Sequence, residues 1–205
     1  MTHMEEISNW KEQGLTYEAY IARWKERLEE SMKGLDRVER RYRFYAKYNW
    51  ERMGKVEEGY EPDEALQQAI AGIDEPQFWL VITEDWCLDS AYAMPILDVA
   101  ARANPNITLR ILLRDSHLDV MDRYLTNGKR NIPKLILFDV RGEEVYTWGP
   151  RPAQAQLHRE ALIAQGVAGS DLSAAMVSWY EEGGWRLIEQ ELVEGLQQFE
   201  ESQPL

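Results

Sequence analysis

Four short apolar runs in the middle of the chain restrict its possible folds more than any other feature. They are rich in β-forming residues and occupy residues 78–83, 107–113, 134–140 and 144–148. Helical patterns separate the first run from the second and the second from the third, and Arg141-Gly142 joins the last two with a hairpin-turn signal. Near-continuous apolar strands in the order β-α-β-α-β-β predict an α/β fold, whose central sheet is covered by helices on both faces.

Helical patterns also flank this central region. Before it, apolar residues recur at three- and four-residue steps, a stripe typical of an amphipathic helix, at Tyr17, Tyr20, Ile21, Trp24 and Leu28. After Gly149-Pro150 we expect helices over residues 153–165 and 172–199, the second weakened at Gly183-Gly184. The chain is therefore expected to consist of an N-terminal helical extension, a central domain and a C-terminal helical extension, at residues 1–74, 75–152 and 153–205.

Composition narrows the class of function. The chain has 205 residues and a net charge of −13, and so acidic a surface repels phosphate. We therefore expect neither nucleic acid nor an anionic membrane as a partner. A single cysteine cannot form an internal disulfide, and three dispersed histidines show no ligand spacing, so no metal or other cofactor is expected. The first residues lack an apolar signal segment and no run approaches the ~20 apolar residues of a membrane span, which predicts a cytoplasmic protein.

The only cysteine, Cys87, lies where the first strand ends and the next helix begins. The unpaired N–H groups and partial positive charge of a helix N-terminus favour a thiolate. Trp86 can shield one side of the sulfur. Ser90, one helical turn on, is expected either to cap the helix or to donate its hydroxyl to the sulfur. The alternative, purely structural interpretation is that Cys87 is a small, inert core residue.

This segment carries a family resemblance. Trp86-Cys87-Leu88-Asp89-Ser90 resembles the thioredoxin active-site segment Trp-Cys-x-x-Cys, with a serine in place of the second cysteine. The resemblance extends to the helix-kinking proline, the cis-proline segment, and the turn and bulge that follow, at Pro95, Ile132-Pro133, Gly142 and Gly149. Together with ITEDWCLDSA, LTNGKRNIPKLILFD and TWGPRP, these residues are similar to a bacterial thioredoxin-like family with added helices at both ends.

The resemblance implies a thioredoxin-like fold and assigns roles. Cys87 would be the nucleophile, and the backbone edge of Ile132, before Pro133, would pair with an extended peptide of the partner. Ser90 cannot resolve a mixed disulfide, and the buried acid of thioredoxins falls at Val81. Arg130 and Lys129 are expected to approach Cys87 through the cis-proline loop, against the negative charges of Glu84, Asp85 and Asp89, which predicts a moderately lowered thiol pKa.

Three functions remain open at this point. The first is a monothiol redox protein, a possible thiol-disulfide oxidoreductase that forms mixed disulfides with a protein or a low-molecular-weight thiol, with a homodimer as one oxidised form. The second is a non-catalytic module that holds a peptide in the thioredoxin groove. The third, an iron–sulfur carrier, is weak because the motif Cys-Gly-Phe-Ser is missing.

Separately, residues 37–55 interleave basic and aromatic residues, which indicates either RNA stacking or, as we prefer, a helix packing its aromatics on the core with its arginines paired to the acidic surface.

Overall fold

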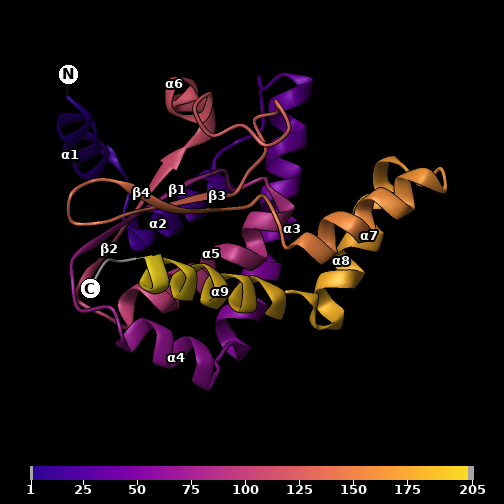
Figure 1. The fold of residues 1–205 in the computed structure, drawn as a ribbon. Coiled ribbons are helices and arrows are strands. Elements are labelled where there is room, and N and C mark those ends of the chain that lie inside the picture. Colours follow the sequence, from indigo (N-terminus) through magenta and orange to yellow (C-terminus); the bar gives the residue numbers. More distant parts are fainter. Residues whose placement is uncertain (1, 203–205) are drawn as a thin grey trace.

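A computed structural model describes residues 2–202 and contains one mixed sheet of four strands (Figure 1). The strands are β1 (Gln77–Thr83), β2 (Ile107–Leu113), β3 (Lys134–Phe138) and β4 (Glu144–Trp148), in the spatial order β2-β1-β3-β4. β1 is parallel to β2 and antiparallel to β3, and β3 is antiparallel to β4. The predicted α/β fold is confirmed, because side chains from both faces of this sheet are covered by helices.

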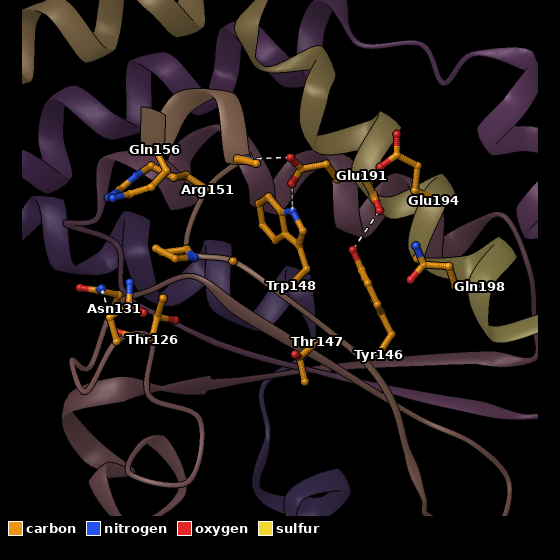
Figure 2. Close-up of a pocket in the computed structure, with 15 residues that line it drawn as sticks. Thr126, Asn131, Tyr146, Thr147, Trp148, Arg151, Gln156, Glu191, Glu194 and Gln198 are labelled. Carbon is orange, nitrogen blue, oxygen red and sulfur yellow. Dashed lines mark hydrogen bonds between the residues drawn. The ribbon is translucent and has the colours of Figure 1, made fainter. Parts of the chain in front are cut away.

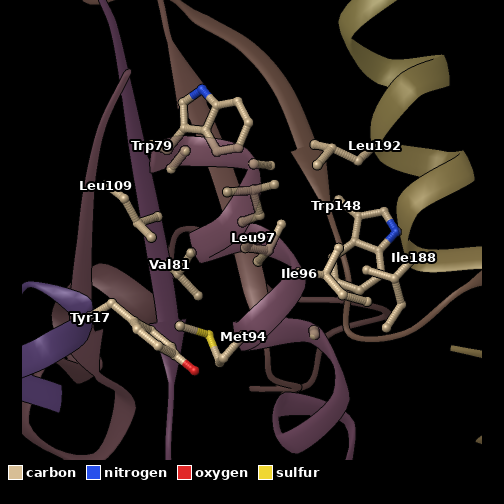
Figure 3. Packing of buried hydrophobic residues seen from close by; sticks show 14 of the residues in the cluster. Tyr17, Trp79, Val81, Met94, Ile96, Leu97, Leu109, Trp148, Ile188 and Leu192 are labelled. Atoms are coloured by element: carbon tan, nitrogen blue, oxygen red, sulfur yellow. The ribbon is translucent and has the colours of Figure 1, made fainter. Parts of the chain in front are cut away.

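Alternation along β1 divides the core into two clusters. Trp79 and Val81 point to the larger one, which α5 (Leu88–Arg102) and α9 (Arg186–Ser202) cover (Figure 3). α4 (Glu64–Ala71) adds Leu66 and Ile70 to the same cluster. Phe78, Leu80 and Ile82 point to the other face, which α1 (His3–Gln13) and α6 (Leu118–Met121) cover. Cys87 belongs to this second, smaller cluster.

The helices before the sheet begin at strong capping residues. Thr2 and Asp36 form capping boxes at the starts of α1 and α3 (Arg37–Gly59), and Thr16 and Asp63 cap α2 (Tyr17–Glu29) and α4. α2 lies along the sheet edge, where Leu15 bridges Ile111 of β2. α3 packs against α5 through its buried stripe, which consists of Ala46, Asn49, Met53 and Val56.

The helices after the sheet pack back onto it. α7 (Ala153–Ala164) and α8 (Gly169–Trp179) project from the molecule, and α9 then returns across β4 (Figure 1). A wider helical turn, Tyr180–Gly184, separates α8 from α9, where Gly183 has a φ of 106°. The weakness predicted at Gly183-Gly184 is thus a break between two helices. None of the helices within residues 2–202 is long and apolar enough to cross a membrane.

Candidate active site around Cys87

Cys87 is the residue that immediately precedes α5, at the carboxyl end of β1. Its side chain is only 8% exposed. The thiol donates a hydrogen bond to the carbonyl oxygen of Ile132, 3.1 Å away, and the Ile132–Pro133 peptide bond is cis. The structure thus brings together three residues that the sequence placed in one site from separate segments.

Ser90 faces the sulfur. Hydrogen bonding from its hydroxyl and its backbone N–H favours the Cys87 thiolate and acts to lower the thiol pKa. The Ser90 oxygen also accepts a 2.6 Å hydrogen bond from the hydroxyl of Thr83, and the pair is buried. Of the two expected roles for Ser90, this geometry favours contact with the sulfur, because no side chain caps the first turn of α5.

The environment nevertheless raises the pKa of the Cys87 thiol to about 11, chiefly because burial disfavours the thiolate and secondly because Asp89 is negative. This corrects the expected moderate lowering. The helix terminus and Ser90 do favour a thiolate, but the sulfur faces an apolar cluster. The hydrogen bond donated to Ile132 stabilises the protonated form further.

Arg151, and not Arg130, is the cation that acts on the sulfur. Arg130 lies on the surface, where its guanidinium holds both oxygens of Asp122 at 2.6 and 2.7 Å. The expected approach of Arg130 to Cys87 is therefore corrected. Arg151, which follows β4, lowers the pKa of the thiol by its charge. The sequence analysis missed it, because nothing near Arg151 in sequence indicates a neighbour 64 positions earlier.

Asp89 anchors Arg151 and links the site to the C-terminal helices. One carboxylate oxygen accepts from Arg151 at 2.6 and 3.1 Å, and the other accepts from the Tyr180 hydroxyl at 2.7 Å. Asp89 and Tyr180 are buried. Three distant segments therefore share one charged network beside Cys87.

Trp86 is held between two partners. Its ring stacks on Tyr42 of α3, with centroids 4.3 Å apart and planes 11° from parallel, and the Arg114 guanidinium lies 4.6 Å from its centroid. Trp86 is half-buried and borders the site, as expected, but α3 supplies its main contact. The N-terminal helices are thus part of the surroundings of the thiol.

Carboxyl groups lie close to the site, although none occupies the position of Val81, which is completely buried in the larger cluster. Glu84 accepts a 2.8 Å hydrogen bond from the backbone N–H of Asp115, and burial raises the pKa of Glu84 to about 7. Asp85 forms an ion pair with Arg27 of α2 at 2.6 Å. Among residues 2–202, no group of three or more potential ligands is arranged to hold a metal ion.

A polar cleft of about 390 Å³ opens beside the cis-proline loop, between β4 and α9 (Figure 2). Asn131, directly before Ile132, lines it together with Arg151. Glu191 of α9 fixes its wall by accepting from the Trp148 ring N–H at 2.6 Å and from the Ala153 N–H at 2.7 Å. The cleft is lined by amide, hydroxyl and carboxylate groups that suit a peptide backbone.

Comparisons with known proteins agree with this geometry. Two solved structures resemble the chain in fold: an HIV epitope-scaffold (20% identity, 96% of this chain and 98% of that one, TM-score 0.60) and a protein of unknown function from Pseudomonas aeruginosa (21%, 99% and 100%, TM-score 0.57). Comparison with curated proteins gave no significant match. A family model described as Thioredoxin matches residues 35–162, more than half of the sequence, so the chain belongs to the thioredoxin family.

Proposed function

We propose that the protein is a monothiol member of the thioredoxin family that forms a mixed disulfide with a partner through Cys87. The observation that carries this proposal is the position of the sulfur. It lies at the start of α5, 3.1 Å from the carbonyl oxygen of Ile132, and Ser90 favours its thiolate form. A thiol at a helix start, beside the backbone that precedes a cis-proline, is placed to meet a disulfide in an extended segment.

The proposed reaction is one thiol-disulfide exchange. Cys87 loses its proton to solvent, and its thiolate attacks one sulfur of the partner disulfide. A new S–S bond then joins Cys87 to the partner, while the partner's other sulfur leaves as a thiolate and takes up a proton. Ser90 stabilises the attacking thiolate but has no sulfur with which to displace the partner. An external thiol therefore attacks the mixed disulfide, restores the Cys87 thiol and remains bonded to the partner.

The raised pKa makes the resting thiol unreactive, and docking offers a way to activate it. A partner strand that pairs with Ile132 donates its own N–H to the carbonyl that now accepts from Cys87. That exchange removes the hydrogen bond that favours the protonated form. Reaction is thereby restricted to partners that bind along the groove, and free disulfides in solution are attacked slowly.

The test compares the wild type with Ser90→Cys. Each protein is supplied with a peptide disulfide and with a reducing system that contains no small thiol. The wild type should accumulate one mixed disulfide per chain and then stop until a small thiol is added. Ser90→Cys places a second thiol one helical turn from Cys87 and should release the peptide and gain modest turnover. Multiple turnovers by the wild type without added thiol would contradict the proposal, as would a complete lack of adduct with docked peptide.

A second candidate function is a non-catalytic peptide-binding module. It is favoured by the burial of Cys87, 8% exposed, and by a thiol pKa of about 11. Under this alternative, Cys87→Ala binds the same peptides as the wild type with unchanged affinity, and no adduct is trapped at any pH below 9. Peptide binding and adduct formation, measured on the same samples, separate the two functions.

A further inference from the structure

One face of α3 exposes aromatic side chains instead of burying them. Phe44, Tyr45 and Tyr48 are 56%, 41% and 42% exposed, although our preferred interpretation had packed the aromatics of this helix on the core. That expectation is corrected for these three rings, because the buried stripe of α3 consists of Ala46, Asn49, Met53 and Val56. It is confirmed for Trp50, which packs against the core beside Trp24. The exposed rings contact one another, with centroids 4.7 Å apart for Phe44 and Tyr48.

Basic residues accompany these rings on the same side of the helix. Positions spaced three, four and seven residues apart lie on one helical face, and this basic-aromatic face consists of Arg37, Arg41, Phe44, Tyr45 and Tyr48. Neither arginine of the face forms an ion pair with any residue in the described part of the chain, whereas Arg43, on another side of α3, pairs with Glu30. Unpaired arginines are unexpected on a chain with a net charge of −13, which offers many carboxylates.

The face borders the candidate active site. Tyr42, next to Arg41 in sequence, stacks on Trp86, and the Arg41 guanidinium lies 5.8 Å from the centroid of the Tyr42 ring. The N-terminal half of α3 extends beyond the sheet (Figure 1). A partner chain that reaches Cys87 past Trp86 therefore has this surface beside it.

We propose that the basic-aromatic face of α3 docks an acidic peptide segment of the protein that reacts at Cys87. The arginines would pair with Asp or Glu of that segment, and the rings would cover its apolar side chains. This inference rests on the proposed function for the identity of the partner, and it adds the partner's chemistry. An acidic, partly apolar peptide complements the charge and the rings of the face. RNA offers phosphates and stacking bases as well, but it carries no disulfide with which Cys87 could react, so a peptide is the occupant that fits both the face and the proposed function.

The experiment measures binding of two fluorescein-labelled synthetic peptides that lack cysteine. One alternates Glu with Leu, and the other carries Lys in place of Glu. Fluorescence anisotropy is read with the Cys87→Ser protein, so that binding is scored without any reaction of the thiol. The acidic peptide should bind at low salt and the basic one should not. Arg37→Glu/Arg41→Glu should weaken the acidic peptide about tenfold, because two attractions become repulsions.

A matched variant and a ring variant complete the design. Lys11→Glu/Lys25→Glu makes the same change of charge on α1 and α2, at exposed positions away from the face, and should leave affinity within about twofold of the parent. Phe44→Ser/Tyr48→Ser keeps the charge and should also weaken binding. Circular dichroism verifies that each variant is folded.

Several results would overturn the inference. They are equal loss of affinity in both charge variants, equal binding of both peptides, tighter binding of oligouridylate than of the acidic peptide, and a dimer in sedimentation that Arg37→Glu/Arg41→Glu dissociates. Acidic-peptide binding that depends on the face, in a protein whose Cys87 never forms an adduct, would support the inference while the proposed reaction fails. The two proposals are therefore tested separately.

Discussion

At the residue scale, the reactivity of Cys87 depends on opposing charges. Asp89, two residues on, raises the thiol pKa, whereas Arg151 lowers it. The Arg151 guanidinium also donates a hydrogen bond to the Asp89 carboxylate, with 2.6 Å between nitrogen and oxygen. Asp89 therefore repels a thiolate and at the same time holds the stabilising cation beside itself. Asp89 is thus a positioning residue, and its charge adds to the burial that keeps the thiol protonated at rest.

We predict that Asp89→Asn lowers the pKa of Cys87. Asparagine has nearly the size and shape of aspartate but carries no charge, so the repulsion of the thiolate is lost and the positive charge of Arg151 acts on the sulfur without a competing carboxylate. The rate of alkylation by iodoacetamide, followed from pH 6 to pH 11, measures this pKa. Each unit of lowering increases the thiolate fraction at neutral pH about tenfold. Tyr180→Phe serves as the control, since it removes one hydrogen bond to Asp89 without a change of charge. A thiol pKa that is unchanged or raised in Asp89→Asn would refute the role given to this charge.

Glu84 makes the stability of the fold depend on pH. Burial raises the pKa of this carboxyl from 4.5 to about 7. Between these values the folded state retains a proton that the unfolded state has lost, so stability falls as pH rises, by about 3 kcal/mol at most. Glu84→Gln keeps an acceptor for the Asp115 N–H and should lose less stability than the wild type between pH 5 and pH 8 in urea titrations. Glu26→Gln, on the exposed side of α2, should follow the wild type; parallel pH profiles for all three proteins would contradict the prediction.

At the scale of elements, the end of β4 supports the loop that carries Pro133. Gly149 has a φ of 111°, and a Cβ atom there would lie 2.1 Å from the carbonyl oxygen of Pro133. We expect Gly149→Ala to cost about 3 kcal/mol or more of unfolding free energy, because both residues directly adjoin paired strands, β3 and β4, and have little freedom to move apart. Gly54→Ala, in α3 with open space around it, should be neutral or stabilising by up to about 1 kcal/mol. Chemical denaturation of both variants measures the contrast, and equal effects would show that the contact is easily relieved.

The sequence predicted elements with strong periodicity and missed those that depend on distant contacts. All four strands were placed to within a few residues, because β1 and β3 are buried apolar runs, β2 is largely apolar, and β4 follows a hairpin-turn signal. The resemblance to thioredoxins predicted the meeting of Cys87, Ser90, Ile132 and Pro133. Arg151 and Tyr180 could not be predicted, since their link to Asp89 depends on how loops and a broken helix pack in three dimensions. The thiol pKa was mispredicted because burial cannot be read from the neighbours of Cys87 in sequence.

At the scale of the whole molecule, the helices before and after the sheet share one core with it. Trp24 of α2, Met53 of α3 and Leu192 of α9 are each 1% exposed and belong to the same cluster as Trp79 of β1. Tyr20 of α2 is also fully buried, and this burial, aided by the charges of Asp85 and Glu84, raises the pKa of its hydroxyl well above the usual value. Removal of either set of helices would therefore expose large apolar side chains and part of the surroundings of Cys87.

We predict that the terminal helices are integral to one cooperative unit. Under native conditions, limited proteolysis should release no stable fragment of about residues 75–152, because that segment alone would expose Trp79 and Leu97. Leu192→Ala should lower the free energy of unfolding by roughly 2–5 kcal/mol and leave a single transition, coincident by tryptophan fluorescence and far-ultraviolet circular dichroism. Leu157→Ala is the matched control. Leu157, in α7, is 65% exposed, so its replacement should change stability little. A protease-resistant central fragment, or two separate transitions in Leu192→Ala, would show instead that the extensions are tethered to an independently folded domain.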